Sequence, residues 1–213
     1  MALRLIHSVL CVALIASSAS SSAAEPKLVF EDTFTDRLAP GWTWLRENPD
    51  AWRLNDGALE ILVEPGDANT VKNALLRPAP DRSKGKLVIE VTLSNATHPT
   101  NQWEQAGLTW YHDGKPALKL VKELVDGKIL IVPGHIPFDA NSVQLRLVID
   151  NDAWTAQYRP DAKGDFKTAA TGKLPPQDKS DQISLQCYHG PPDRRHWIRF
   201  NNFRIVQTTD NPD

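Results

Sequence analysis

The chain has 213 residues and a formal net charge of −2, with 24 Lys and Arg against 26 Asp and Glu. Basic residues are scattered, which excludes the basic stripe typical of a nucleic-acid-binding protein. Residues 1–24 combine Arg4, an apolar run from Leu5 to Ala16 and a small-residue end at Ala24. This pattern predicts a secretory signal peptide that is cleaved after Ala24, and therefore a secreted or periplasmic protein.

The rest of the chain favours one domain without cross-links. No apolar run after residue 24 reaches the roughly 20 residues that a membrane span needs, so we expect no membrane span. Cys187 is the only cysteine beyond residue 24, so we expect no disulfide within one mature chain. The sequence predicts a single domain over 25–207, a flexible tail over 208–213, and a monomer.

Apolar and polar residues alternate over short stretches between turn signals, which is the pattern of half-buried strands. No long stretch shows helical spacing. In chain order, the strands are predicted at 28–30, 58–63, 87–93, 105–111, 117–125, 128–132, 143–149, 154–158, 183–188 and 197–206.

Two turn signals connect the strands between residues 105 and 132. Asp113-Gly114 and Asp126-Gly127 are typical of tight type I′ hairpins, which need positive φ at both turn residues. They predict an antiparallel meander of three strands. About ten strands in one domain favour an all-β fold, either a two-sheet antiparallel β-sandwich of jelly-roll type or a closed barrel.

Tryptophans lie next to polar residues at two places. Trp44 is followed by Arg46 and Glu47, and Trp103 directly precedes Glu104 and Gln105. Sugars stack their C–H faces on flat rings, and their hydroxyls need paired donors and acceptors. Such clusters are therefore candidates for a carbohydrate site, although a tryptophan in a sandwich also fills the core.

Alternation places further polar residues on the strand faces turned away from the core. Gln105 and Tyr111 share one such face, and Tyr188 lies on another, followed by His189 where the strand ends. Lys119 and Glu123 share a parity in the strand after the first hairpin. These residues are candidate ligand contacts, while a charged strand face is also commonly a solvated one.

Several motifs together resemble the concanavalin A-like lectin/glucanase domain. The motifs are Gly41-Trp-Thr-Trp-Leu-Arg-Glu47, Glu104-Gln-Ala-Gly-Leu-Thr-Trp110, Lys119-Leu-Val-Lys-Glu123 and Phe200-Asn-Asn-Phe-Arg-Ile205. More narrowly, the chain is similar to the C-terminal jelly-roll domain of family 43 β-xylosidases and to its uncharacterised single-domain secreted relatives. The resemblance covers about residues 28 to 207.

The resemblance implies a jelly roll of two antiparallel sheets, with a glycan bound on the concave sheet face or at its rim. It also implies a structural Ca²⁺ near both termini, for which Asp32 and Asn201 or Asn202 would supply oxygens. Glucanases of this fold carry two catalytic acids on one strand as Glu-x-Asp-x-x-Glu, and this sequence has no such run.

Three hypotheses on function remain open. The first is an exported carbohydrate-binding domain for a poly- or oligosaccharide, without catalysis. The second is a glycoside hydrolase or lyase, which needs two acids close together, such as Glu104 with Glu47 or with Glu123. The third is an exported structural or protein-interaction module, for which the aromatic and charged residues named above have only structural roles.

Overall fold

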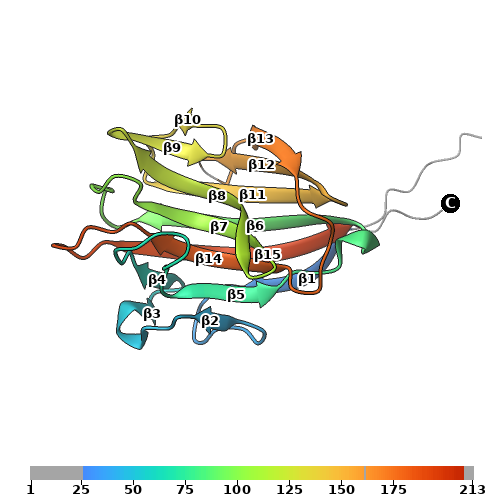
Figure 1. Ribbon diagram of the computed structural model, residues 1–213, viewed down its shortest axis with the longest axis horizontal. Helices are drawn as coiled ribbons and strands as arrows, with labels where there is room; N and C mark the ends of the chain where they lie inside the picture. Colours follow the sequence, from blue (N-terminus) through green and yellow to red (C-terminus); the bar gives the residue numbers. More distant parts are fainter. Residues whose placement is uncertain (1–25, 161, 209–213) are drawn as a thin grey trace, which may run out of the picture.

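The structure, a computed structural model, describes residues 26–160 and 162–208 (Figure 1). The predicted signal peptide and most of the predicted tail lie outside these residues. The elements are β1 (Lys27–Asp32), β2 (Thr43–Leu45), η1 (Pro49–Ala51), β3 (Trp52–Leu54), β4 (Leu59–Leu62), β5 (Ala74–Pro78), η2 (Arg82–Lys84), β6 (Lys86–Asn95), β7 (Gln105–His112), β8 (Lys115–Val125), β9 (Lys128–Val132), β10 (Ile136–Pro137), β11 (Ser142–Asp150), β12 (Ala153–Arg159), β13 (Lys167–Lys173), β14 (Gln182–Tyr188) and β15 (Trp197–Thr208). Within this described part, no helix is long and apolar enough to cross a bilayer.

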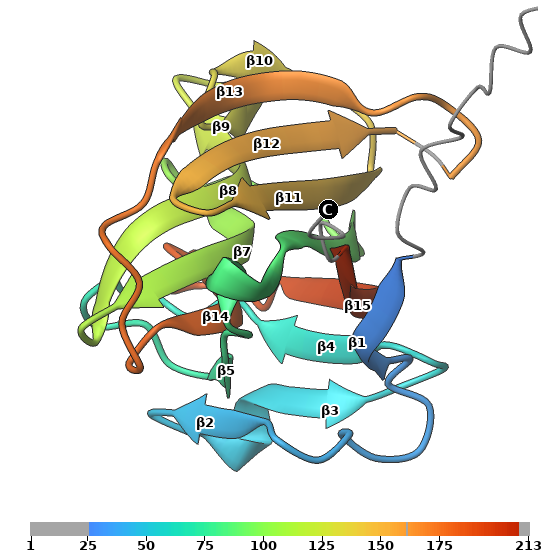
Figure 2. The same cartoon turned by 90° about the vertical axis from the view of Figure 1, so that its right-hand side faces the viewer.

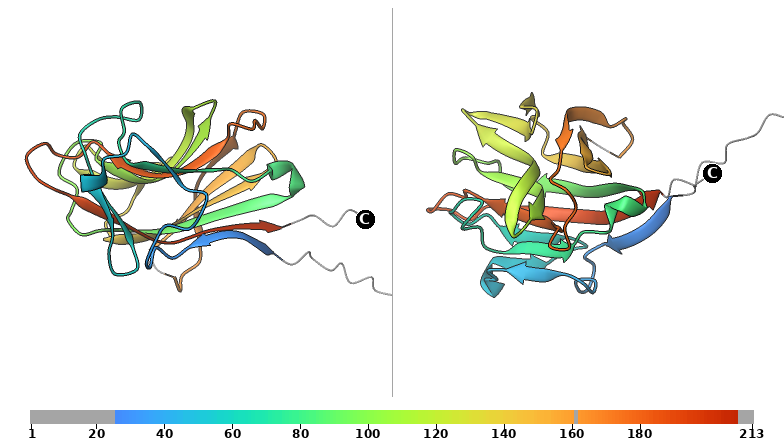
Figure 3. Two further views of the ribbon diagram at one scale, coloured as in Figure 1. Left: turned by 90° about the horizontal axis from the view of Figure 1, so that it is seen from below. Right: turned by 45° about the vertical axis from the view of Figure 1, so that its right-hand side comes forward.

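The strands form two antiparallel sheets that lie against each other as layers (Figure 3). Sheet A has the order β13-β12-β11-β6-β15-β4-β3, and β1 also pairs with β15, as Figure 2 shows. Sheet B has the order β10-β9-β8-β7-β14-β5-β2. The sheets are not joined into a closed barrel, so the all-β sandwich prediction is confirmed and the barrel alternative is wrong.

The core fills the space between the sheets, and strand alternation determines which side chains enter it. Leu108 and Trp110 of β7 and Leu145 of β11 are 1%, 1% and 0% exposed, as their parity predicts. Cys187 is buried in the same cluster, and burial raises the pKa of its thiol. The side chains between these core residues lie on the outer face of each sheet.

Both predicted hairpins are present. Asp113 and Gly114 join β7 to β8, Asp126 and Gly127 join β8 to β9, and all four residues have positive φ. The prediction omitted five strands, which are β2, β3, β5, β10 and β13. β2, β3 and β10 have only two or three residues, too few to show alternation, and no residue of the edge strand β13 is fully buried.

A loop over residues 63–73 covers part of the outer face of sheet B. Its Val71 and Ala68 pack against Tyr111, Tyr188 and Leu76, so these three sheet residues are buried although they point away from the core. The backbone N–H of His189 donates to the carbonyl of Gly66 in this loop at 3.2 Å. The loop thereby forms a wall along part of this sheet face.

Candidate functional site

The outer face of sheet B carries a connected polar cluster on β7 and β8. Gln105 lies opposite Glu123 in the strand register, so their side chains are neighbours. The Gln105 amide donates to Glu123 Oε1 at 2.9 Å and accepts from Lys119 Nζ at 2.9 Å. Lys119 Nζ also donates to Glu123 Oε2 at 3.0 Å. The charges of Lys119 and Glu123 therefore compensate each other.

A second polar group lies beside this cluster, under the loop 63–73. The hydroxyls of Tyr111 and Ser184 donate to Gln186 Oε1 at 2.9 and 3.0 Å. Because both donors need an acceptor, they fix the orientation of the Gln186 amide. Its Nε2 has no hydrogen-bond partner among residues 26–160 and 162–208. Burial raises the pKa of Tyr111, so its hydroxyl stays protonated over the physiological range.

A cavity of about 260 Å³ opens between this face and the surrounding loops. Thr109 and Lys119 supply its polar lining. Tyr188 supplies an aromatic ring, and burial raises the pKa of the Tyr188 hydroxyl. Its apolar walls come from the loop 63–73 and from the beginning of β8. The residues of these walls are Ala68, Pro116, Ala117 and Leu118.

An exposed tryptophan lies at the other end of the same face. Trp103 directly precedes β7 and is 52% exposed, and its carbonyl accepts a hydrogen bond from the Gln105 amide at 2.9 Å. The Trp103 ring centroid is 5.9 Å from that of His189, which is 5.3 Å from that of Tyr188. Three rings therefore form a row from the rim toward the sheet face.

The structure brings together five of the ten predicted ligand residues, and a sixth lies beside them. Gln105, Lys119, Glu123, Tyr188 and His189 form the cluster and its rim. Tyr111 lies on the same face but is covered by Val71. The Tyr111 hydroxyl supports the sheet face beneath the loop 63–73 through its hydrogen bond to Gln186.

The other four predicted ligand residues lie elsewhere. The Trp44 ring packs on Trp52 with centroids 4.8 Å apart, and Glu47 accepts from the Trp52 indole N–H at 3.1 Å. Arg46 donates to the carbonyl of Val71 at 3.0 Å and helps to hold the loop 63–73. Glu104 is 1% exposed and points away from the cluster.

Glu104 is instead part of a buried pair behind the sheet face. His196 Nδ1 donates to Glu104 Oε1 at 2.7 Å, and the backbone N–H groups of Thr100 and Asn101 donate to Oε2. Glu104, Glu47 and Glu123 thus have separate partners in different places. The arrangement does not favour the acid pair that the hydrolase hypothesis needs.

Asp32 does not fit the calcium site that was expected. Its two carboxylate oxygens accept N–H groups from Phe34, Ala39 and the Trp42 indole at 2.8 to 2.9 Å. These three donors use three of the roughly four lone-pair sites of the carboxylate, so at most one is left for Ca²⁺. Asn202 is exposed at a bulge of β15, and the described residues contain no group of three His, Cys, Asp or Glu side chains that could hold a metal ion.

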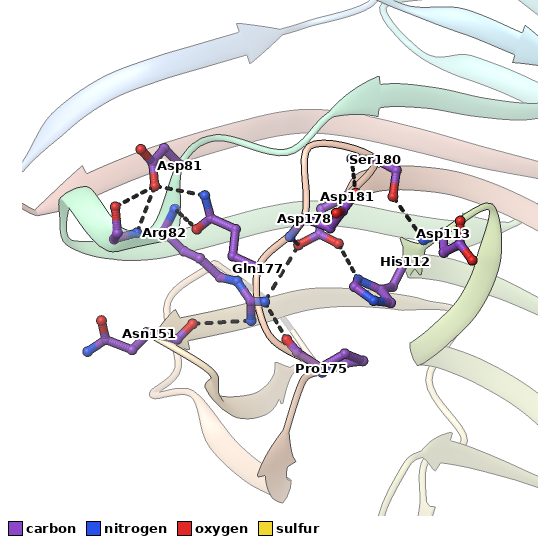
Figure 4. Close-up of polar contacts among 11 residues, drawn as sticks. Asp81, Arg82, His112, Asp113, Asn151, Pro175, Gln177, Asp178, Ser180 and Asp181 are labelled. Carbon is purple, nitrogen blue, oxygen red and sulfur yellow. Dashed lines mark hydrogen bonds and ion pairs between the residues drawn. The ribbon is translucent and has the colours of Figure 1, made fainter.

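A buried ion pair supports the hairpin that walls the cavity (Figure 4). His112, at the end of β7, donates through Nδ1 to Asp181 at 2.7 Å, and Arg82 lies 3.6 Å from the other Asp181 oxygen. The backbone N–H of Asp113 donates to Ser180 Oγ at 3.0 Å. The loop before β14 therefore holds the β7–β8 hairpin in place.

Thr109 and Ala68 were absent from the sequence prediction, and Trp103 was named there only as part of a cluster of tryptophan and polar residues, not as a ligand contact. Thr109 shares the parity of Gln105 and Tyr111, so alternation alone could have added it. Trp103 is the aromatic residue directly before β7, and its position at the strand end was a usable signal. Ala68 has no signal in the sequence, because a small residue in a loop shows nothing about what it covers.

The comparisons with known proteins show the fold. The chain matches no family model and no curated protein. The GH43 protein BlXynB from Bacillus licheniformis is similar in structure, with a TM-score of 0.67 and 19% identity over 83% of this chain and 39% of that chain. This chain therefore spans about two fifths of that protein.

Two further structures are similar over nearly their whole length. The CBM2 module of the evolved Dit of Lactobacillus casei BL23 phage J-1 has a TM-score of 0.62 and 11% identity, over 90% of this chain and 100% of that chain. SCLam, a GH16 endo-β-1,3(4)-glucanase, has a TM-score of 0.56 and 14% identity, over 90% and 94%. This chain thus has the concanavalin A-like jelly-roll sandwich, as predicted.

Proposed function

We propose that the protein is an exported carbohydrate-binding domain that holds a poly- or oligosaccharide on the outer face of sheet B. The observation that carries the proposal is the exposed Trp103 beside the polar cluster of Gln105, Lys119 and Glu123. An exposed ring offers a flat surface to the C–H face of a sugar, and Lys119, whose side chain is 36% exposed, can donate to its hydroxyls.

The fold and its relatives support this proposal at a coarse level. Solved structures of the same fold include a GH43 protein, a GH16 glucanase and a module that is called CBM2. Binding without hydrolysis is the better match to the site, because the hydrogen-bond partners of Glu123 within residues 26–160 and 162–208 are Lys119 and Gln105 and include no second acid. Retaining hydrolysis would need two carboxyl groups about 5 Å apart.

Binding can be measured on purified residues 25–213 with xylan, arabinan, β-glucan and pectin, by retardation in native gels that contain one polysaccharide each. We expect retardation by at least one polysaccharide and no release of reducing sugar. Retardation together with reducing-sugar release would favour the hydrolase hypothesis. Absence of retardation on the whole panel would contradict the proposal and favour a structural or protein-interaction module.

The Trp103→Ala variant locates the binding surface. We expect it to weaken binding by about tenfold or more while the melting temperature stays unchanged, because the ring is exposed and contributes little to the core. Leu28→Ala is the matched control, since Leu28 is also apolar and 53% exposed but lies on β1 in sheet A. Equal loss of binding in both variants would mean that Trp103 is not the platform.

A further inference from the structure

The cavity at the hairpin end of the sheet B face contains an unexplained buried hydroxyl. Thr109 is 2% exposed, and its Oγ1 has no hydrogen-bond partner among residues 26–160 and 162–208. Leaving a buried polar group unpaired costs about 1–3 kcal/mol, and such groups in native proteins usually have a reason. Because Thr109 lines the cavity, a ligand bound in the cavity would supply the missing hydrogen-bond partner.

The neighbours of Thr109 are committed to other partners. Lys119 lies opposite it on β8, but the Lys119 ammonium group donates to Gln105 and Glu123. Ser184 lies opposite it on β14, but the Ser184 hydroxyl donates to Gln186. The Thr109 hydroxyl is therefore left to donate and to accept, as a sugar hydroxyl also does.

The walls of the cavity indicate its orientation and capacity. Pro116 and Ala117 line it at the hairpin end, where the strand register shifts at a β-bulge, and Ala68 and Tyr188 line other sides. Its volume of about 260 Å³ is below the range usual for drug-sized ligands, so it suits one sugar unit. From Thr109 the face continues for about 14 Å along β7 to Gln105, and then to Trp103.

Charge narrows the class of sugar. Among the described residues, Lys119 is the only charged one that lines the cavity, and Glu123 compensates its charge at 3.0 Å. A uronate carboxyl would have to compete with Glu123 for this ammonium group. A neutral sugar unit needs only hydroxyl partners and apolar walls.

We propose that this cavity is the subsite for the terminal unit of a neutral glycan, and that Thr109 hydrogen-bonds a hydroxyl of that unit. The inference rests on the proposed carbohydrate function and adds the orientation of the chain. The terminal unit lies between Pro116, Ala117 and Tyr188, and the following units extend over Gln105 toward Trp103.

Thr109→Val tests the hydroxyl at nearly constant volume. Removing an unpartnered buried hydroxyl leaves the unfolding free energy unchanged or raises it, whereas loss of a ligand hydrogen bond weakens binding by about three- to tenfold. The probes are neutral oligosaccharides of two to six units from xylan, arabinan and β-glucan, with galacturonate oligosaccharides for comparison, measured by isothermal titration calorimetry. Thr92→Val, on the half-buried outer side of β6 in sheet A, is the matched control.

Ala117→Leu tests the cavity independently, because Ala117 is exposed and a larger side chain there narrows the cavity without filling the core. We expect weaker binding in this variant. For the wild type, we expect one protein bound per oligosaccharide, whatever the length of the oligosaccharide. If the wild type binds but both variants bind equally well, or if several molecules bind along one chain, the cavity is not a terminal subsite and the proposed function stands. If the wild type binds none of the oligosaccharides, both proposals fail.

Discussion

Lys122 is a charged residue on the core-facing side of β8. Its ammonium group donates to Asn95 Oδ1 at 3.1 Å and to the carbonyl of Ala140 at 2.7 Å, and it is 4% exposed. Desolvation by burial lowers its pKa from 10.5 to about 8, while the nearby Asp139 carboxylate opposes this shift. Lys122 joins β8 of sheet B to β6 of sheet A and to the loop before β11.

This lowered pKa predicts a pH dependence of stability. Between pH 8 and 10.5 the unfolded state retains the Lys122 proton and the folded state releases it, so the unfolding free energy rises with pH. The contribution is at most about 1.4 kcal/mol per pH unit. We expect the unfolding free energy of the wild type to increase relative to that of Lys122→Met from pH 8 to pH 10, as measured by urea denaturation.

Subtracting the variant from the wild type removes the contributions of other groups, such as Tyr111 and Tyr188, whose pKa values are raised. Lys128→Met is the control, because Lys128 on β9 is exposed. A constant difference over this pH range would mean that Lys122 titrates like a solvated lysine.

At the scale of elements, the β7–β8 hairpin is the part of the molecule that connects the sheet to the candidate cavity. Its Asp113-Gly114 turn was predicted because a type I′ turn is a local property of two residues. Its support was not predicted, because His112 and Asp181 are 69 residues apart in the chain. Only the pairing of β14 with β7 brings them together.

The Asp181→Asn variant tests this support. Asp181 is 4% exposed and its charge compensates the buried Arg82, so we expect the substitution to lower the unfolding free energy by about 1.5–3 kcal/mol. Amide protons over residues 112–118 should also exchange faster than in the wild type, as measured by hydrogen exchange.

Asp150→Asn is the comparison for this variant, because Asp150 pairs with Lys86 at 3.4 Å on an exposed surface, and such pairs contribute about 0–1 kcal/mol. If the two substitutions have equal effects, the Asp181 pair does not hold the hairpin. Unchanged exchange at residues 112–118 would lead to the same conclusion.

At the scale of the whole molecule, the proposed function requires export. The pattern of residues 1–24 predicts cleavage after Ala24, so the exported protein should begin at Glu25. Expression of the full chain in a bacterium, followed by fractionation and intact-mass measurement, should find the form 25–213 outside the cytoplasm. Recovery of the full-length chain from the cytoplasm alone would contradict export.

Part of the candidate site could be predicted from the sequence. Side chains in a strand alternate with period two, so Gln105, Tyr111 and Tyr188 were correctly placed on faces opposite the core. Glu104 was predicted as a ligand contact because it lies next to Gln105 in the chain, and the structure places it apart from the cluster. In a strand, adjacent residues point to opposite sides, and Glu104 instead pairs with His196.

The all-β class, the two tight hairpins and the inward and outward faces of the long strands follow from local sequence patterns, because these depend on residues a few positions apart. The order of the strands in each sheet, the loop 63–73 over Tyr111 and Tyr188, and the cavity around Thr109 were decided only by the tertiary structure. These features join segments that are far apart in the chain. Which segments are in contact depends on the packing of both sheets around one core, and local sequence patterns do not predict these contacts.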